Sequence, residues 1–261
     1  MRKVIGVLSG KGGTGKTTTV VNLGLAMHKL GENVVIVDGD LRNPNIGIHL
    51  GSIESYMTLH DILDREISLL EALHIHETGL RFIPAHLSLN YLNTDASKLK
   101  NILKHFDCTV LLDAPSGLDK GALAVLEAAD ESLIVTTPHL PDLTGCLKTI
   151  ELARNMDVLI KGIVLNNICG HKHEISKKEI ETVSNTEVIH SIPCDKNIAM
   201  SIAAKMPVVE RLPFSPASIA FFELASKLTG REYKKPRFLA MRRIAHKVLP
   251  KSHSFKNTEK S

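Results

Sequence analysis

A glycine-rich stretch near the start of the chain places the tightest constraint on its fold. Residues 10–17, with the sequence GKGGTGKT, follow an apolar run at residues 4–8 and precede a helical pattern at residues 18–30. A buried strand that leads through such a loop into a helix is the setting of the motif G-x-x-x-x-G-K-[ST]. Because glycines carry no Cβ, successive backbone N–H groups can converge on a phosphate at the positive end of the helix. The sequence therefore predicts a nucleotide-binding loop.

The side chains of this loop have separate expected roles. Lys16 reaches the β- and γ-phosphates of a nucleotide, and the hydroxyl of Thr17 can ligate Mg²⁺. The residues expected to contact the nucleotide here are Gly10, Lys11, Gly12, Gly13, Thr14, Gly15, Lys16, Thr17 and Thr18.

Lys11 needs an explanation of its own, because a second ammonium beside Lys16 is unfavourable unless an anion neutralises it or it points elsewhere. The loop resembles the deviant Walker A signature K-G-G-x-G-K-[ST] of the MinD/ParA-type ATPases and their nitrogenase iron protein relatives. The resemblance implies an ATP-dependent homodimer in which Lys11 contacts the nucleotide of the second subunit, much like an arginine finger. The alternative is a solvated loop lysine.

Acidic residues follow two further predicted strands. Residues 33–37 lead into Asp38-Gly39-Asp40, and the strand at residues 108–113 ends in Asp113, followed by Ala114-Pro115-Ser116-Gly117. Ligands of doubly wound sheets gather at the carboxyl ends of strands, so these acids are expected beside the phosphate loop. One carboxylate can hold a Mg²⁺-bound water, and another can orient the attacking water.

The family patterns D-x-D and D-x-P-x-G give these acids specific implied roles. By resemblance, Asp40 is catalytic together with Lys11 and Lys16, while Asp38 and Asp113 join Thr17 around the metal. Gly117 would let its loop approach the γ-phosphate. An Asp pair that merely caps the next helix is the alternative for residues 38–40.

Two later strand ends resemble the adenine pocket of the family. Asn166 follows a predicted strand at residues 161–165, and Pro193 follows one at residues 188–192. The resemblance implies that both line the base, with the amide of Asn166 pairing with the adenine edge. Many relatives have Asn-Arg where this chain has Asn166-Asn167, so stacking by the second residue is not implied. Asn166 as a plain turn residue is the alternative.

Length and composition bound the architecture. A chain of 261 residues with 43% hydrophobic content fits one large α/β domain, expected at residues 1–230. Near-continuous apolar strands alternate with helical patterns, which predicts a doubly wound, mostly parallel sheet covered by helices on both faces. The chain has no apolar run of ~18 residues, no signal peptide and no cysteine framework, so we expect a cytoplasmic protein.

Residues 231–261 form a basic tail. Pro236 and Pro250 flank residues 237–249, whose periodicity predicts a short helix with one apolar and one basic face. MinD proteins carry such a C-terminal helix, so the resemblance implies reversible, peripheral binding to the anionic inner face of the cell membrane. Packing of this helix on the body, or contact with DNA, stays open.

Two further patterns carry less weight. Cys169-Gly170-His171-Lys172-His173 could bind zinc, but a structural site needs four ligands and no partner pair is evident, so we expect a solvated loop. Residues 38–44 also resemble the D-x-D-L-R-x-P segment of bacterial tyrosine kinases, yet the chain lacks their tyrosine-rich tail.

The sequence as a whole predicts a MinD-like, Mg²⁺-dependent ATPase that positions the division site or another cellular structure. An activator protein is a possible partner by resemblance. A ParA-like partition ATPase that binds DNA is the main alternative, and a tyrosine kinase is a more distant one.

Overall fold

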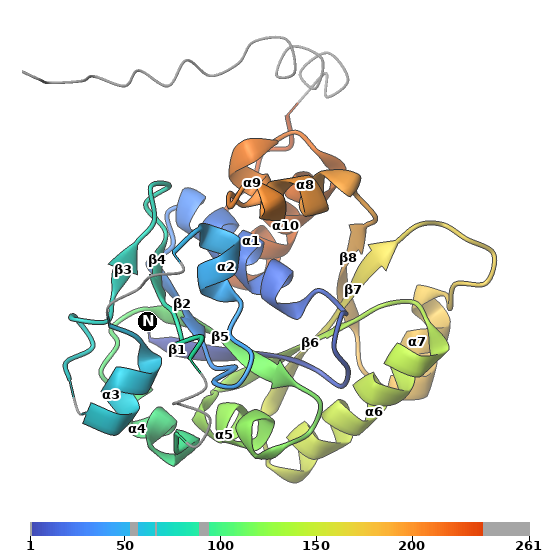
Figure 1. Cartoon of the computed structure of the whole chain (residues 1–261). Helices are drawn as coiled ribbons and strands as arrows, with labels where there is room; N and C mark the ends of the chain where they lie inside the picture. The colour runs from blue at the N-terminus through green and yellow to red at the C-terminus, as the bar shows by residue number, and fades with distance from the viewer. Residues whose placement is uncertain (1, 53–56, 66, 89–93, 237–261) are drawn as a thin grey trace, which may run out of the picture.

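The fold is built on one eight-stranded sheet. The computed structural model describes residues 2–52, 57–65, 67–88 and 94–236. The strand order is β3-β4-β2-β5-β1-β6-β7-β8, and every pairing is parallel except that of β3 with β4 (Figure 1). The strands are β1 (Lys3–Ser9), β2 (Val34–Asp38), β3 (His74–Ile75), β4 (Arg81–Ile83), β5 (Thr109–Ser116), β6 (Glu131–Thr136), β7 (Leu159–Ile168) and β8 (Val188–Pro193).

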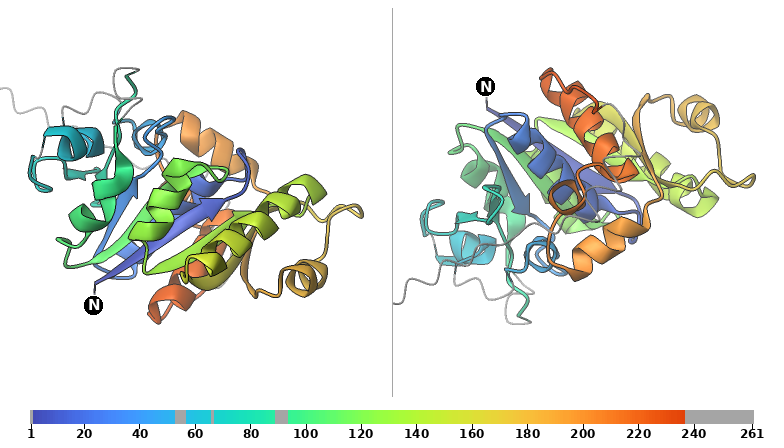
Figure 2. Two further views of the ribbon diagram at one scale, coloured as in Figure 1. Left: turned by 90° about the horizontal axis from the view of Figure 1, so that it is seen from below. Right: turned by 90° about the horizontal axis from the view of Figure 1, so that it is seen from above.

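Helices cover both faces of this sheet (Figure 2). One layer holds α3 (Leu59–Arg65), the 3-10 helix η2 (Ala96–Lys98), α4 (Leu99–Leu103), α5 (Lys120–Ala128), α6 (Leu140–Asn155) and α7 (Lys177–Ser184). The other layer holds α1 (Lys16–Lys29), α2 (Ile46–Leu50), α8 (Lys196–Ala203), α9 (Val208–Arg211) and α10 (Pro216–Thr229). The doubly wound, mostly parallel α/β architecture predicted from the sequence is confirmed.

The central strands explain the two layers. All five residues of β2 are buried, and their side chains alternate between the two cores. Val35 and Val37 pack with the layer of α3–α7, whereas Val34 and Ile36 pack with the layer of α1 and α10. A strand that is apolar on both faces is stable only when both faces are covered, which is why β2 reads as a continuous apolar run.

The short elements differ from the sequence prediction. The helix expected at residues 59–73 ends at Arg65, and the one expected at residues 95–106 ends at Leu103 after a 3-10 turn. The sequence predicted neither β3 nor the helices α2, α8 and α9. These helices span four to eight residues, too few to show a period, and an isolated helix of that length is unstable. Contacts with elements that are distant in the sequence hold these helices in place.

The start of the basic tail lies against the body. Arg231 pairs with Glu32 at 2.8 Å, Lys235 pairs with Glu223 at 3.0 Å, and the ring of Tyr233 stacks on Phe222. The predicted helix at residues 237–249 lies outside the described residues, so its existence stays a prediction. Within the described part of the chain, no helix has both the length and the apolarity to cross a bilayer.

The phosphate loop leaves the sheet at its centre, because β1 lies between β5 and β6. There α6 packs closely against the start of the loop. A Cβ placed on Gly10 would meet the backbone of Gly145 at 2.1 Å, so only glycine permits this approach. A Cβ on Gly12, in contrast, would meet Ser116 Oγ at 3.6 Å, which is ordinary contact.

We therefore expect Gly10→Ala to lower the free energy of unfolding of the nucleotide-free chain by about 1–3 kcal/mol, since backbone must move to admit the methyl group. Gly12→Ala is the matched control from the same loop and should change stability much less. Urea unfolding of the two variants measures the difference. Equal stabilities would contradict the close contact between α6 and the loop.

Candidate nucleotide site

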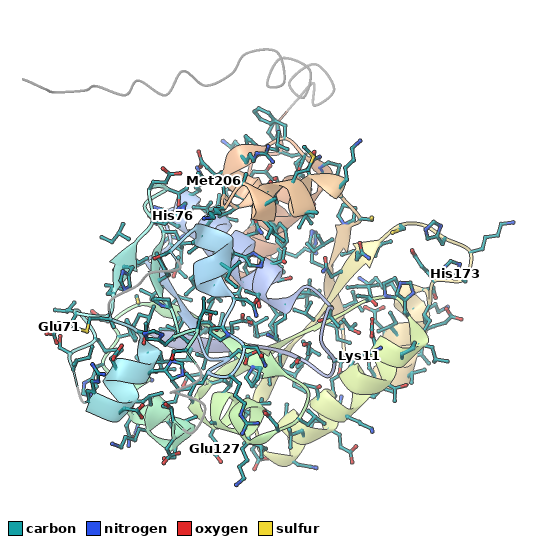
Figure 3. All side chains as sticks on the ribbon, viewed as in Figure 1. Lys11, Glu71, His76, Glu127, His173 and Met206 are labelled. Carbon is teal, nitrogen blue, oxygen red and sulfur yellow. The ribbon has the colours of Figure 1, made fainter. Side chains whose placement is uncertain are left out.

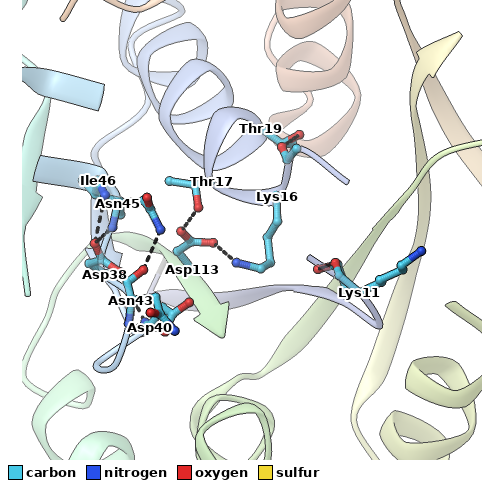
Figure 4. A network of polar contacts seen from close by, with 12 residues as sticks. Lys11, Lys16, Thr17, Thr19, Asp38, Asp40, Asn43, Asn45, Ile46 and Asp113 are labelled. Atoms are coloured by element: carbon cyan, nitrogen blue, oxygen red, sulfur yellow. Dashed lines mark hydrogen bonds and ion pairs between the residues drawn. The ribbon is translucent and has the colours of Figure 1, made fainter. Parts of the chain in front are cut away.

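The carboxylate of Asp113, in β5, joins two side chains of the phosphate loop. Lys16 Nζ lies 2.9 Å from Asp113 Oδ1, and Thr17 Oγ1 donates to Asp113 Oδ2 at 2.6 Å (Figure 4). The side chain of Lys16 is 8% exposed and that of Asp113 is fully buried. The ammonium, the hydroxyl and the strand-end acid predicted from three separate segments are therefore in direct contact.

Asp38 lies beside Asp113, because the two residues are register partners in β2 and β5. It is fully buried, and its carboxylate accepts N–H bonds from Asn45 and Ile46, each at 2.9 Å, and from Asp40 at 3.3 Å. The bonds at residues 45–46 cap the start of α2. Burial raises the pKa of Asp38 well above its usual range, and the neighbouring charge of Asp113 raises it further. Asp38, at the end of β2, thus holds in place the segment that follows it, residues 38–45, here called the acidic turn.

Asp40 closes that turn. Its Oδ1 accepts the backbone N–H of Asn43 at 3.0 Å, and its side chain is nearly buried. Burial raises the pKa of Asp40, although the N–H bond and the charge of Lys16 act in the opposite direction. The capping role that the sequence left as an alternative is observed for Asp38, and the backbone bond of Asp40 is a local turn contact.

The donor set fits a divalent cation. Three carboxyl groups, from Asp38, Asp40 and Asp113, lie near one another with a single ammonium, that of Lys16, in contact with Asp113, and a bound cation would favour their charged forms. The hydroxyl of Thr17 adds another oxygen, and Mg²⁺ prefers oxygen ligands. Asp113 and Thr17 are the two residues best placed to bind the ion, because the oxygens of Asp38 already accept three N–H bonds.

Lys11 does not face this network. Its side chain is directed away from Asp113 (Figure 4) and lies 3.4 Å from the carboxylate of Asp142, in the first turn of α6. Thr137 donates a hydrogen bond to the other oxygen of Asp142. The side chain of Lys11 remains 55% exposed. The repulsion between two loop lysines is therefore avoided by separation, and Asp142 is a partner that the sequence analysis missed.

Asn166 contacts the phosphate loop itself. Its side-chain Nδ2 donates to the carbonyl of Thr14 at 2.7 Å. A Cβ on Gly15 would lie 2.2 Å from that nitrogen, and Gly15 also has a φ of 88°, so two reasons require glycine there. Pro193 ends β8 and is the register partner of Ile168 in β7, at the same edge of the sheet. The adenine contacts of Asn166 and Pro193 stay predictions.

The remaining predicted residues surround the same loop. Gly117, with a φ of 89°, donates its N–H to the carbonyl of Ser9 at 3.1 Å, so the segment after β5 lies against the loop. Gly13 also has a positive φ, and Thr18 lies in the first turn of α1, where its carbonyl accepts from Asn22. The segments chosen from the sequence therefore meet at one edge of the sheet.

Comparisons with known proteins agree with this geometry. The ParA family model, described as NUBPL iron-transfer P-loop NTPase, matches residues 1–229. The chain is 34% identical over 232 residues to an uncharacterized ATP-binding protein of Methanocaldococcus jannaschii, covering 87% of this chain and 88% of that protein. It is 32% identical over 221 residues to the septum site-determining protein MinD of Thermotoga maritima, covering 80% and 81% of the two chains.

Solved structures of MinD proteins are also similar to this chain in fold and sequence. MinD of Pyrococcus horikoshii, in complex with Mg-ADP, has a TM-score of 0.83 and 29% identity, covering 88% of this chain and 96% of that one. The cell division ATPase MinD of Pyrococcus furiosus has a TM-score of 0.83 and 31% identity, with coverage of 88% and 99%. The chain is therefore a member of the MinD/ParA family of P-loop NTPases.

Proposed function

We propose that this protein hydrolyses ATP with Mg²⁺ in a homodimer whose two sites each borrow one lysine from the other subunit. The observation that carries the proposal is the division of the two loop lysines. Lys16 is buried against Asp113, whereas Lys11 is half exposed and directed away from the site of its own chain. An exposed lysine that is directed away from its own site can reach toward the site of a second subunit.

Residues of one chain would bind the nucleotide. The backbone N–H groups of the loop and the ammonium of Lys16 hold the phosphates. Thr17 and Asp113 would hold Mg²⁺, which supplies neutralisation of the phosphate charge when bound. Asp40, held by the turn at Asn43, orients water for in-line attack on the γ-phosphate.

Closure of the dimer would require Lys11 to leave Asp142. The pair is partly exposed at 3.4 Å, and such ion pairs contribute at most about 1 kcal/mol in water. A triphosphate offers a denser negative charge, so the exchange is favourable when a second loaded subunit approaches. In this scheme Asp142 holds the side chain of Lys11 away from its own site until the second subunit binds.

Mixing two inactive variants tests the exchange of lysines. Lys11→Ala and Asp40→Asn should each lose at least about a hundredfold in ATP turnover, because each removes one part of the transition-state environment. Mixed pairs hold one complete site, so the equimolar mixture should recover roughly a quarter of wild-type turnover.

Lys172→Ala, an exposed lysine outside the loop, is the matched control and should keep full turnover. Nucleotide binding by Lys11→Ala should also persist. A mixture that stays inactive, or a Lys11→Ala chain that hydrolyses ATP normally, would refute the shared site.

The stability of Asp40→Asn relative to wild type should increase as the pH rises. Burial raises the pKa of Asp40, so the folded chain binds more protons than the unfolded chain between the ordinary carboxyl pKa and the raised value. Wild-type stability therefore loses a contribution as pH rises through that interval. Asp40→Asn lacks this titration, and its free energy of unfolding relative to wild type should increase from about pH 4 to about pH 7.

Urea unfolding of nucleotide-free protein at several pH values measures that difference. Glu127→Gln, which removes an exposed carboxylate of α5, is the control for general charge effects. A flat or decreasing difference for Asp40→Asn would contradict the burial of its charge.

We further propose that ATP controls residence on an anionic membrane through the predicted helix at residues 237–249, and that the protein positions the division site or another structure. Relatives named as septum site-determining proteins and the basic, amphipathic sequence of the tail support this. One such helix binds a bilayer weakly, but two on a dimer bind much more tightly.

Truncation after Lys235 should abolish ATP-dependent pelleting with anionic vesicles and leave nucleotide binding intact. Ile244→Asp, on the predicted apolar face, should do the same, whereas Ser252→Asp beyond the predicted helix is the matched control. Unchanged pelleting of the truncated chain would refute the membrane role. Salt-sensitive binding to duplex DNA in place of vesicles would favour the partition alternative.

A further inference from the structure

A cluster of metal-ligating side chains lies where β7 and β8 end. The loop between β7 and α7 carries Cys169, His171 and Glu174, whose ligand atoms all lie within 4.8 Å of one another. Cys194 lies directly after β8, the strand that pairs with β7. Both cysteines are free and exposed.

The sheet brings the two cysteines to adjacent strand ends. Ile168 and Pro193 are register partners, so Cys169 and Cys194 are the next residues along two adjacent strands. The N–H of Cys194 also donates to the carbonyl of Ile168 at 2.8 Å. Cys169 and Cys194 are 25 positions apart in the sequence, which is why the sequence of the loop alone does not show that they are neighbours.

A tight turn brings in the carboxylate. Glu174 accepts the backbone N–H of Cys169 at 2.9 Å with one oxygen and that of Gly170 at 3.0 Å with the other. Each carboxylate oxygen has a further lone pair, so these bonds orient Glu174 and leave it able to coordinate an ion. The turn therefore presents a thiol, an imidazole and a carboxylate toward one point.

The loop is also anchored to the start of α6. Ile175 donates its N–H to the carbonyl of Pro138 at 2.9 Å. The ring of His173, labelled in Figure 3, stacks on His171 at 5.2 Å and on His139 at 6.2 Å between centroids. A row of packed imidazoles restricts His171, which lowers the entropy lost when it binds an ion.

We propose that Cys169, His171, Glu174 and Cys194 form a tetrahedral site for a borderline divalent ion of the Zn²⁺ type. Two sulfurs, one nitrogen and one oxygen are a donor set that zinc accepts and that hard Mg²⁺ does not. Metal–ligand bonds of about 2.0–2.3 Å place tetrahedral ligand atoms roughly 3.3–3.8 Å apart. The ligand atoms of Cys169, His171 and Glu174, within 4.8 Å of one another, close by a small movement, and the exposed thiol of Cys194 must swing in from the adjacent strand end. Binding would release the two thiol protons to water.

Such an ion would fasten the loop after β7 to the end of β8. Asn166 and Pro193 lie on these same two strands, within three residues of the ligating cysteines. The site is separate from the acidic cluster at Asp113, so zinc affinity does not depend on whether the ATPase proposal is correct. The solvated loop expected from the sequence is the alternative to this proposal, in which Glu174 and Cys194 supply the two further ligands.

Zinc titration of the reduced, full-length, nucleotide-free chain tests the site, with excess Mg²⁺ present to occupy oxygen ligands. Competition with a chromophoric chelator should give one tightly held Zn²⁺ per chain. Cys169→Ser, Cys194→Ser and His171→Gln should each weaken binding by more than about tenfold. His105→Gln and Cys146→Ala remove an exposed imidazole and a buried thiol elsewhere and should leave affinity unchanged.

Cobalt provides a second readout that a folding defect would not imitate. Co²⁺ in the wild-type site should show the visible bands of tetrahedral coordination and a sulfur-to-cobalt charge-transfer band. That band should fall to about half in either single cysteine variant, because one of two thiolates remains. Absence of the charge-transfer band, or zinc affinity that Cys194→Ser leaves intact, would overturn the four-ligand site.

Discussion

The buried carboxylate of Asp113 is the interaction on which the candidate site depends. Its oxygens hold Lys16 and Thr17 of the phosphate loop, and its backbone carbonyl accepts the N–H of Gly39 at 2.8 Å. One residue of β5 thus positions the loop after β1 and the acidic turn after β2. Removing one partner of a buried ion pair leaves a buried charge uncompensated, at a cost of about 3–5 kcal/mol. The phosphate loop and the acidic turn are therefore coupled parts of one unit.

The nucleotide-free site brings three carboxyl groups together with a single buried ammonium, so charging all three costs free energy. Asp38 is fully buried beside Asp113, and its three N–H bonds offset only part of the cost of its charge. A cation and the loop amides together would relieve this imbalance, so local stability is traded for affinity. Such a trade is common where a site must bind a highly charged ligand.

Sequence patterns predicted what depends on local chemistry. Gly10 to Thr17, Asp38, Asp40 and Asp113 follow apolar strands, and the parallel sheet brings their ends to one edge. The sequence could not predict Asp142 as the partner of Lys11, because the two residues are 131 positions apart. Nothing in the sequence of a helix's first turn indicates which distant residue it will contact. Asn166 was assigned to the base from its place after a strand, whereas its contact with Thr14 required the folded loop. The sequence could not predict Cys194 as a neighbour of Cys169 for the same reason, since only the register of β7 and β8 places the two residues at adjacent strand ends.

The packing of α6 against the phosphate loop has a mechanical consequence. Gly145 touches Gly10 near one end of this helix, and near the other end the guanidinium of Arg154 donates to the carbonyls of Ser184 and Asn185. A 16-residue helix is a stiff rod about 24 Å long. We therefore expect a change of loop shape that displaces Gly145 to be transmitted along α6 to the turn between α7 and β8, which Arg154 contacts.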